Sequence, residues 1–94
     1  MGEMKRVHVF FQGHVQGVGF RYRTFNLARH FAVTGWARNR TNGQVELVAE
    51  CTEDDLQKFL AAIEEDMADH ITDVQKSWAA ASGKFTAFTI EPTE

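Results

Sequence analysis

The chain has 94 residues, 44% of them hydrophobic, and a formal net charge of −3 at pH 7. This length predicts one domain, residues 1–94. The sequence has no run of roughly 18 apolar residues, so no membrane span is expected. It shows no leader with a cleavage site, so the protein is predicted to be cytoplasmic. The single cysteine excludes an internal disulfide, and the negative charge argues against a nucleic-acid partner.

The first third of the chain is predicted to form a strand, a loop and a helix. Residues 4–12 alternate between apolar and more polar side chains, which is typical of a strand. Residues 13–19 contain three glycines, a density that regular elements tolerate poorly, so this segment is predicted to be a loop. Residues 20–32 carry apolar side chains at helical spacing.

The middle of the chain is predicted to form a β-hairpin. Residues 34–40 and 44–51 read as strands, and Asn42-Gly43 between them is a strong signal for a tight turn. In the second of these strands, Val45, Leu47 and Ala49 are predicted to face the core.

The last part of the chain is predicted to form a helix and two strands. Thr52 is an expected N-cap, and an apolar stripe follows it to about Ala68. Strands are expected at residues 71–81 and 85–91. The order is βαββαβ plus a terminal strand, which predicts an α+β sandwich of ferredoxin-like type with two helices on one face of an antiparallel sheet. That topology brings the loop after the first strand close to the end of the second.

Charge is distributed unevenly along the chain. Residues 1–43 carry seven Lys and Arg and one acid, giving +6, whereas residues 44–94 carry three Lys and twelve acids, giving −9. Either the acids lie on a solvated helix face of the second half, or the first half is free of acids because it holds an anion. Charge alone does not decide between these interpretations.

The glycine-rich loop is a candidate anion site. Its glycines allow consecutive N–H groups to point to one spot beside the positive end of a helix, and Arg21 follows at once. A guanidinium there can hold two phosphate oxygens. The loop lacks the Gly-Lys-Ser/Thr of a P-loop, and Tyr22 stands where a dinucleotide fingerprint needs its last glycine. A ribonucleoprotein motif would lie on a central strand, not on a loop that enters a helix.

Two spaced motifs resemble the acylphosphatase family. The string GHVQGVGFR, Gly13–Arg21, resembles the phosphate loop of that family, and GWARN, Gly35–Asn39, resembles its second motif. The resemblance implies a ferredoxin-like fold and hydrolysis of a carboxyl-phosphate bond to a carboxylate and inorganic phosphate, with no metal and no other cofactor. The chain departs from the family pattern at Phe11, Cys51 and Glu91.

The resemblance also assigns roles to individual residues. Arg21 takes the role of the phosphate-binding arginine, and Asn39 that of the asparagine that orients the attacking water. The backbone of the loop would form the oxyanion cradle; its residues are His14, Val15, Gln16, Gly17, Val18, Gly19 and Phe20. The role of the Gln16 side chain stays open.

Such a site is chemically sufficient to hydrolyse an acyl phosphate. The leaving group of an acyl phosphate is a carboxylate, whose conjugate acid has a pKa of about 4, so no general acid is needed at neutral pH. Phosphoryl transfer depends mainly on positioning and charge stabilisation.

The expected substrate is a small acyl phosphate, and the protein is expected to be a monomer. The alternatives are a non-catalytic phosphate-binding module of the same fold, the carbamoyl-phosphate-handling domain of a larger hydrogenase-maturation protein, and an RNA-binding domain.

Overall fold

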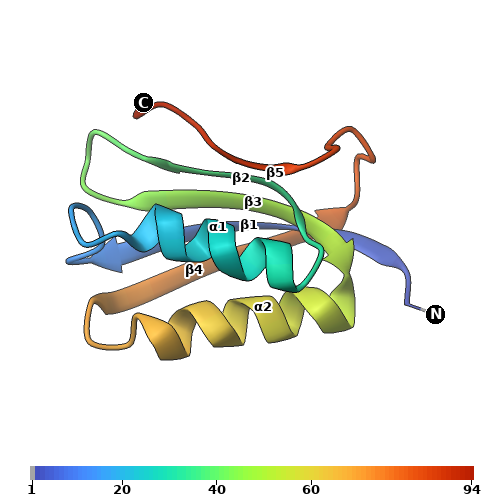
Figure 1. Ribbon diagram of the computed structural model, residues 1–94, viewed down its shortest axis with the longest axis horizontal. Coiled ribbons are helices and arrows are strands. Elements are labelled where there is room, and N and C mark those ends of the chain that lie inside the picture. Colours follow the sequence, from blue (N-terminus) through green and yellow to red (C-terminus); the bar gives the residue numbers. More distant parts are fainter. Residues whose placement is uncertain (1) are drawn as a thin grey trace.

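The computed structural model describes residues 2–94, which form seven elements (Figure 1). In chain order they are β1 (Met4–Gly13), α1 (Phe20–His30), β2 (Thr34–Asn39), β3 (Val45–Thr52), α2 (Glu53–Asp66), β4 (Ile71–Ala80) and β5 (Phe88–Ile90). The predicted order of elements is confirmed. The largest difference lies at the end of the chain, where the last strand begins three residues later than expected.

The sheet has the strand order β4-β1-β3-β2-β5. The pairs β1–β3, β1–β4 and β2–β3 are antiparallel, as predicted, but β5 runs parallel to β2, so the prediction of an antiparallel sheet was wrong at this edge. The cause is the connection that follows β4. It carries the chain from one edge of the sheet to the other and reverses its direction, so β5 points the same way as β2.

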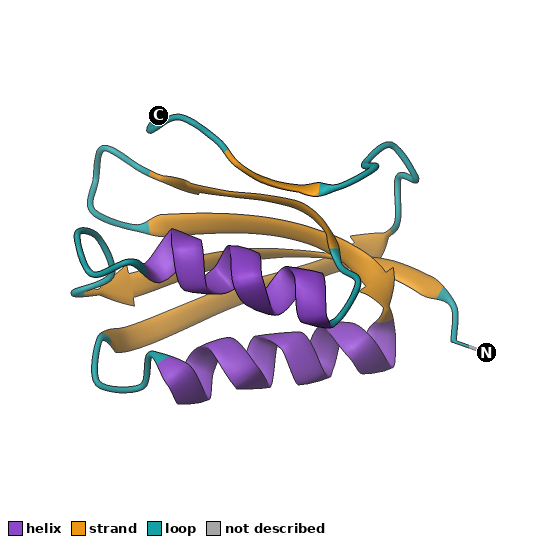
Figure 2. Ribbon diagram, in the orientation of Figure 1, coloured by secondary structure: helices purple, strands orange, loops and turns teal. Residues whose placement is uncertain are grey.

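Both helices cover the same face of the sheet (Figure 2). On that face Val7, Val9 and Phe11 of β1 are fully buried, as the alternation in the sequence predicts. Central strand β3 differs, because all its residues from Val45 to Cys51 are buried. Its second face is covered as well, by charged and aromatic side chains from the neighbouring strands and from the segment that follows β4. None of the helices within residues 2–94 has the length and apolar character to span a membrane.

Two local features fix the ends of elements, one beside Met4 at the start of β1 and one near the loop that follows β1. Helix α2 begins at Glu53, directly after Thr52. The Thr52 hydroxyl accepts a hydrogen bond from the backbone N–H of Asp55 at 3.4 Å, which confirms the predicted N-cap. The turn between β2 and β3 is closed by hydrogen bonds from Arg40 N to Gln44 O (2.8 Å) and from Gly43 N to Arg40 O (3.1 Å). This short turn fixes Asn39 at the last position of β2.

Candidate active site

The segment between β1 and α1 forms a cradle that needs glycine. Gly17 and Gly19 have φ angles of 77° and 78°, in the left-handed region that other residues rarely adopt. Gly19 is the N-cap of α1, and no side chain caps this helix or places an acid in its first turn. The first amides of α1 are therefore left to interact with an anion, which the positive end of the helix dipole favours.

The cradle is anchored in the core at both ends. Val15 and Phe20 are each 1% exposed, and the ring of Phe20 packs on that of Phe11 with centroids 4.9 Å apart. The backbone N–H of His14 donates to the carbonyl of His70 at 2.8 Å. This bond occupies the amide of His14, the first residue of the predicted oxyanion cradle.

A clamp ties the loop to the β2–β3 hairpin, and sequence analysis did not find it. The side-chain Nε2 of Gln16 donates to the carbonyl oxygens of Arg40 (2.7 Å) and Gln44 (2.9 Å). Because Arg40 follows Asn39 directly, the clamp fixes the loop relative to the end of β2. The glutamine stands within the first motif, but its partners are 24 and 28 residues away, so no local pattern could identify them.

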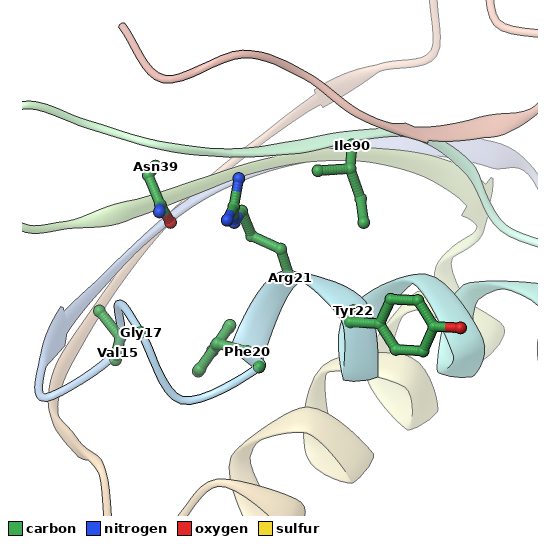
Figure 3. Close-up of a pocket in the computed structure, with 8 residues that line it drawn as sticks. Val15, Gly17, Phe20, Arg21, Tyr22, Asn39 and Ile90 are labelled. Carbon is green, nitrogen blue, oxygen red and sulfur yellow. The ribbon is translucent and has the colours of Figure 1, made fainter.

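Arg21 and Asn39 lie in one pocket (Figure 3). The pocket has a volume of about 200 Å³, and its lining residues are Val15, Gly17, Gly19, Phe20, Arg21, Tyr22, Asn39 and Ile90. The guanidinium of Arg21, from the first turn of α1, points toward the side chain of Asn39. The structure thus brings together the two residues that the sequence singled out, as the topology predicted. The side chains of His14, Gln16 and Val18 do not line this pocket.

Among the described residues, neither the Arg21 guanidinium nor the Asn39 Oδ1 atom has a partner. Within residues 2–94, no carboxylate lies within 4.0 Å of the Arg21 guanidinium, whereas Arg6, Arg23 and Arg38 each pair with an acid. The Oδ1 atom of Asn39 is buried and accepts no hydrogen bond from any described residue. A buried carbonyl oxygen without a donor costs about 1–3 kcal/mol, so this arrangement favours a bound molecule that donates to it.

Part of the uneven charge of the sequence is explained by ion pairs between the two halves. Glu46, the first acid after Glu3, is 4% exposed, and its carboxylate bonds to His8 (2.6 Å), Arg38 (2.9 Å) and Arg40 (3.1 Å). Burial alone would raise the pKa of Glu46, but the hydrogen bonds from His8 and Arg38 and the charges of those two residues outweigh burial and lower the pKa below its ordinary value. The basic first half therefore has a role that neither predicted interpretation included, because its arginines neutralise buried acids of β3, while Arg21 stays unpaired.

A second buried acid holds the segment after β4. Glu50 is 2% exposed and accepts hydrogen bonds from the N–H (2.8 Å) and hydroxyl (2.8 Å) of Ser82 and from the N–H of Gly83 (3.0 Å). Burial raises the pKa of Glu50. The hydrogen bonds from Ser82 and Gly83 and the charge of Arg6 outweigh burial, so the pKa of Glu50 is lowered below its ordinary value. Glu50 thus fixes the connection that leads to β5 and to the pocket residue Ile90.

Other candidate chemistry is not assembled by the fold. In the part of the chain that the structure describes, no group of three or more His, Cys, Asp or Glu side chains could hold a metal ion. Cys51 is buried at 7% exposure, as expected of a strand residue facing the core. Its sulfur makes only long contacts, the shortest at 3.8 Å to the carbonyl of Ala32.

The fold and the pocket define a class of protein. The protein is an α+β sandwich whose pocket combines a strand–loop–helix cradle of backbone amides, an unpaired arginine and a buried amide oxygen without a donor. These are features that suit a phosphate-type anion.

Comparison with known proteins narrows the class. The family model described as Acylphosphatase matches residues 7–90. The chain is 39% identical over 90 residues to the acylphosphatase of Salinibacter ruber, covering 95% of each chain. It is 42% identical over 94 residues to that of Pyrobaculum aerophilum, covering 97% of this chain and 98% of the relative. It matches the crystal structure of acylphosphatase from Bacillus subtilis with a TM-score of 0.84 at 30% identity, covering 93% of this chain and 98% of the other.

The chain belongs to the acylphosphatase family. The membership confirms the family, the fold and the enzyme class that the two motifs predicted: the protein is a hydrolase that acts on acyl phosphates.

Proposed function

We propose that Arg21 and the backbone amides from Val15 to Phe20 hold the phosphoryl group of an acyl phosphate, while Asn39 orients the water that attacks phosphorus. The observation that carries the proposal is the buried Oδ1 of Asn39, which has no donor and lies in the same pocket as an unpaired guanidinium. A water molecule that donates one hydrogen to Asn39 Oδ1 has its own lone pairs on the side away from Asn39. Those lone pairs then face a phosphoryl group held by Arg21.

The reaction balances without a general acid. The water oxygen forms a bond to phosphorus, the bond between phosphorus and the carboxyl oxygen breaks, and its electron pair leaves on the carboxylate. A dianionic acyl phosphate and water thus give a carboxylate and dihydrogen phosphate, which carries both water protons until it equilibrates with the solvent. Because the leaving carboxylate is stable unprotonated at neutral pH, the site has to supply only position and positive charge.

The remaining expectations are part of the same proposal. We assign the protein to the cytoplasm and treat residues 1–94 as one domain that acts as a monomer without a cofactor. The supporting observations are a single buried cysteine, as in a reducing compartment, and the one core shared by all seven elements.

The proposal separates the roles of its two side chains, so kinetics can test it. Hydrolysis of benzoyl phosphate and its inhibition by inorganic phosphate are measured for Asn39→Ala and Arg21→Ala. Asn39→Ala should lower kcat by roughly 10²–10³ and leave phosphate inhibition unchanged, because water is not part of phosphate binding. Arg21→Ala should lower kcat/KM by about 10³ or more and weaken phosphate inhibition.

Two control variants lie on α1 outside the pocket. Arg29→Ala and Asn26→Ala remove exposed side chains of the same types and should leave both readouts unchanged. Loss of phosphate inhibition in Asn39→Ala would contradict its assigned role. A folded wild-type protein that binds phosphate without turnover would instead be the non-catalytic binding module.

A further inference from the structure

The pocket has two ends, and the proposed chemistry uses only one of them. In phosphoryl transfer the attacking and leaving oxygens lie roughly in line on opposite sides of phosphorus. If Asn39 holds the water, the acyl group has to leave on the side of the phosphoryl group away from Asn39.

Ile90 occupies that side. In the sheet, Ile90 of β5 pairs with Ala37 of β2, two residues before Asn39, which separates the two side chains by about 7 Å along the strand. Figure 3 shows Asn39 and Ile90 on opposite sides of the Arg21 guanidinium, with Tyr22 beyond Arg21 on the side of Ile90. An acyl group leaving in line therefore points to Ile90 and Tyr22.

The Ile90 side chain and the Tyr22 ring present apolar surface to the solvent. Ile90 is 39% exposed and Tyr22 is 65% exposed, which places both among the few large hydrophobic side chains that stay exposed in the described chain. Exposed apolar side chains that gather at a pocket mouth are typical of a binding surface. Apart from Arg21 and Asn39, which the phosphoryl group and the water engage, no residue that lines the pocket has a charged or amide side chain.

We infer that Ile90 and Tyr22 form an acyl subsite that favours bulky apolar acyl groups, aromatic or branched, over small polar ones. The inference rests on the proposed function, because that function fixes where the phosphoryl group and the water lie. An aromatic acyl group buries carbon against Ile90 and the Tyr22 ring, whereas acetyl and carbamoyl groups reach little of this surface. Its one polar group is the Tyr22 hydroxyl, which lies at the tip of the ring that points away from Arg21 (Figure 3). The substrate class is thus the phosphate anhydrides of apolar carboxylic acids.

The test compares two substrates across two variants of the subsite. Ile90→Thr keeps the β-branched shape that suits a strand and adds a hydroxyl, and Tyr22→Ser removes an exposed ring from α1. Wild type should show a higher kcat/KM for benzoyl phosphate than for acetyl phosphate. Each variant should lower kcat/KM for benzoyl phosphate by about three- to tenfold and change that for acetyl phosphate less than twofold.

Phosphate inhibition and a distant variant complete the design. Inorganic phosphate has no acyl group, so its inhibition constant should not change in either variant. Trp78→Ser removes another side chain of 39% exposure, on β4 at the opposite edge of the sheet from β5, and should leave the substrate ratio unchanged.

Three outcomes are distinguishable. A selective loss of benzoyl phosphate turnover supports the subsite. Equal losses on both substrates, or no loss in variants shown to be folded by their thermal melting, overturn it. Absence of turnover of both substrates in the wild type would contradict the proposed function itself rather than the subsite.

Discussion

The clamp made by Gln16 gives the sharpest prediction about the architecture of the site. In Gln16→Ala, two carbonyl oxygens, those of Arg40 and Gln44, lose their side-chain donor at 2.7 and 2.9 Å. A hydrogen bond of this kind contributes about 0.5–1.5 kcal/mol, so the free energy of unfolding should fall by about 2 kcal/mol. For a domain of this size, that loss lowers Tm by roughly 8–16 °C.

The same change should slow catalysis, although Gln16 does not line the pocket. The clamp fixes the loop relative to the residue that follows Asn39, and misplacement of a reacting group by about 1 Å costs up to roughly a hundredfold in rate. We therefore expect kcat for benzoyl phosphate to fall by roughly ten- to a hundredfold.

The assay is thermal unfolding followed by circular dichroism, together with steady-state kinetics. Gln57→Ala is the control, since it removes an exposed glutamine from α2 and should change neither measurement appreciably. Gln16→Glu should be at least as harmful as Gln16→Ala, because a carboxylate cannot donate to two carbonyls. A Gln16→Ala protein with the wild-type Tm and kcat would refute the reasoning.

Three further predictions concern stability. Glu46→Gln should lower the free energy of unfolding by about 2 kcal/mol at pH 7. Because the folded pKa of Glu46 is lowered, its contribution is present above the unfolded pKa of 4.5 and is lost as the pH falls through the folded value, so the difference between the two proteins in urea titrations should shrink as the pH is lowered below 4.5. A difference that does not shrink in acid would contradict this account of Glu46. Gly19→Ala should lower the free energy of unfolding by about 1–2 kcal/mol in the same titrations at pH 7. The whole effect comes from the φ of 78° at Gly19, because a Cβ there meets no atom within 4 Å. Equal stability of the variant and the wild type would show that the loop adopts another conformation. Thr52→Ala should remove the α2 cap and about 1 kcal/mol while leaving kcat unchanged, and a variant as stable as wild type would show that the cap contributes nothing.

The sequence predicted the local features of this protein well, because local physics determines them. The period of apolar residues predicted the elements, Asn42-Gly43 predicted the hairpin, and Thr52 predicted the start of α2. The glycines predicted the loop, and the two motifs identified Arg21 and Asn39, which the structure places in one pocket.

The features that the sequence did not predict are non-local. The parallel pairing of β5 depends on how seven residues cross from one edge of the sheet to the other, and the two hydrogen bonds of Gln16 depend on a hairpin that lies far along the chain. The burial of Glu46 could not be predicted from alternation alone. It requires Arg38 of β2 and Arg40 of the turn that follows it to neutralise a charge on β3, and this is visible only once the register of the two strands is known.

The central claim is that water, oriented by Asn39, attacks the phosphorus of an acyl phosphate without help from a metal ion. The measurement that tests it most directly is hydrolysis of benzoyl phosphate in ¹⁸O-labelled water with EDTA present, analysed by mass spectrometry of both products. The account predicts undiminished turnover with one labelled oxygen in inorganic phosphate and none in benzoate. Label in benzoate would place the attack on the carbonyl carbon, and loss of turnover on adding EDTA would show that a metal ion is required; either result would contradict the account.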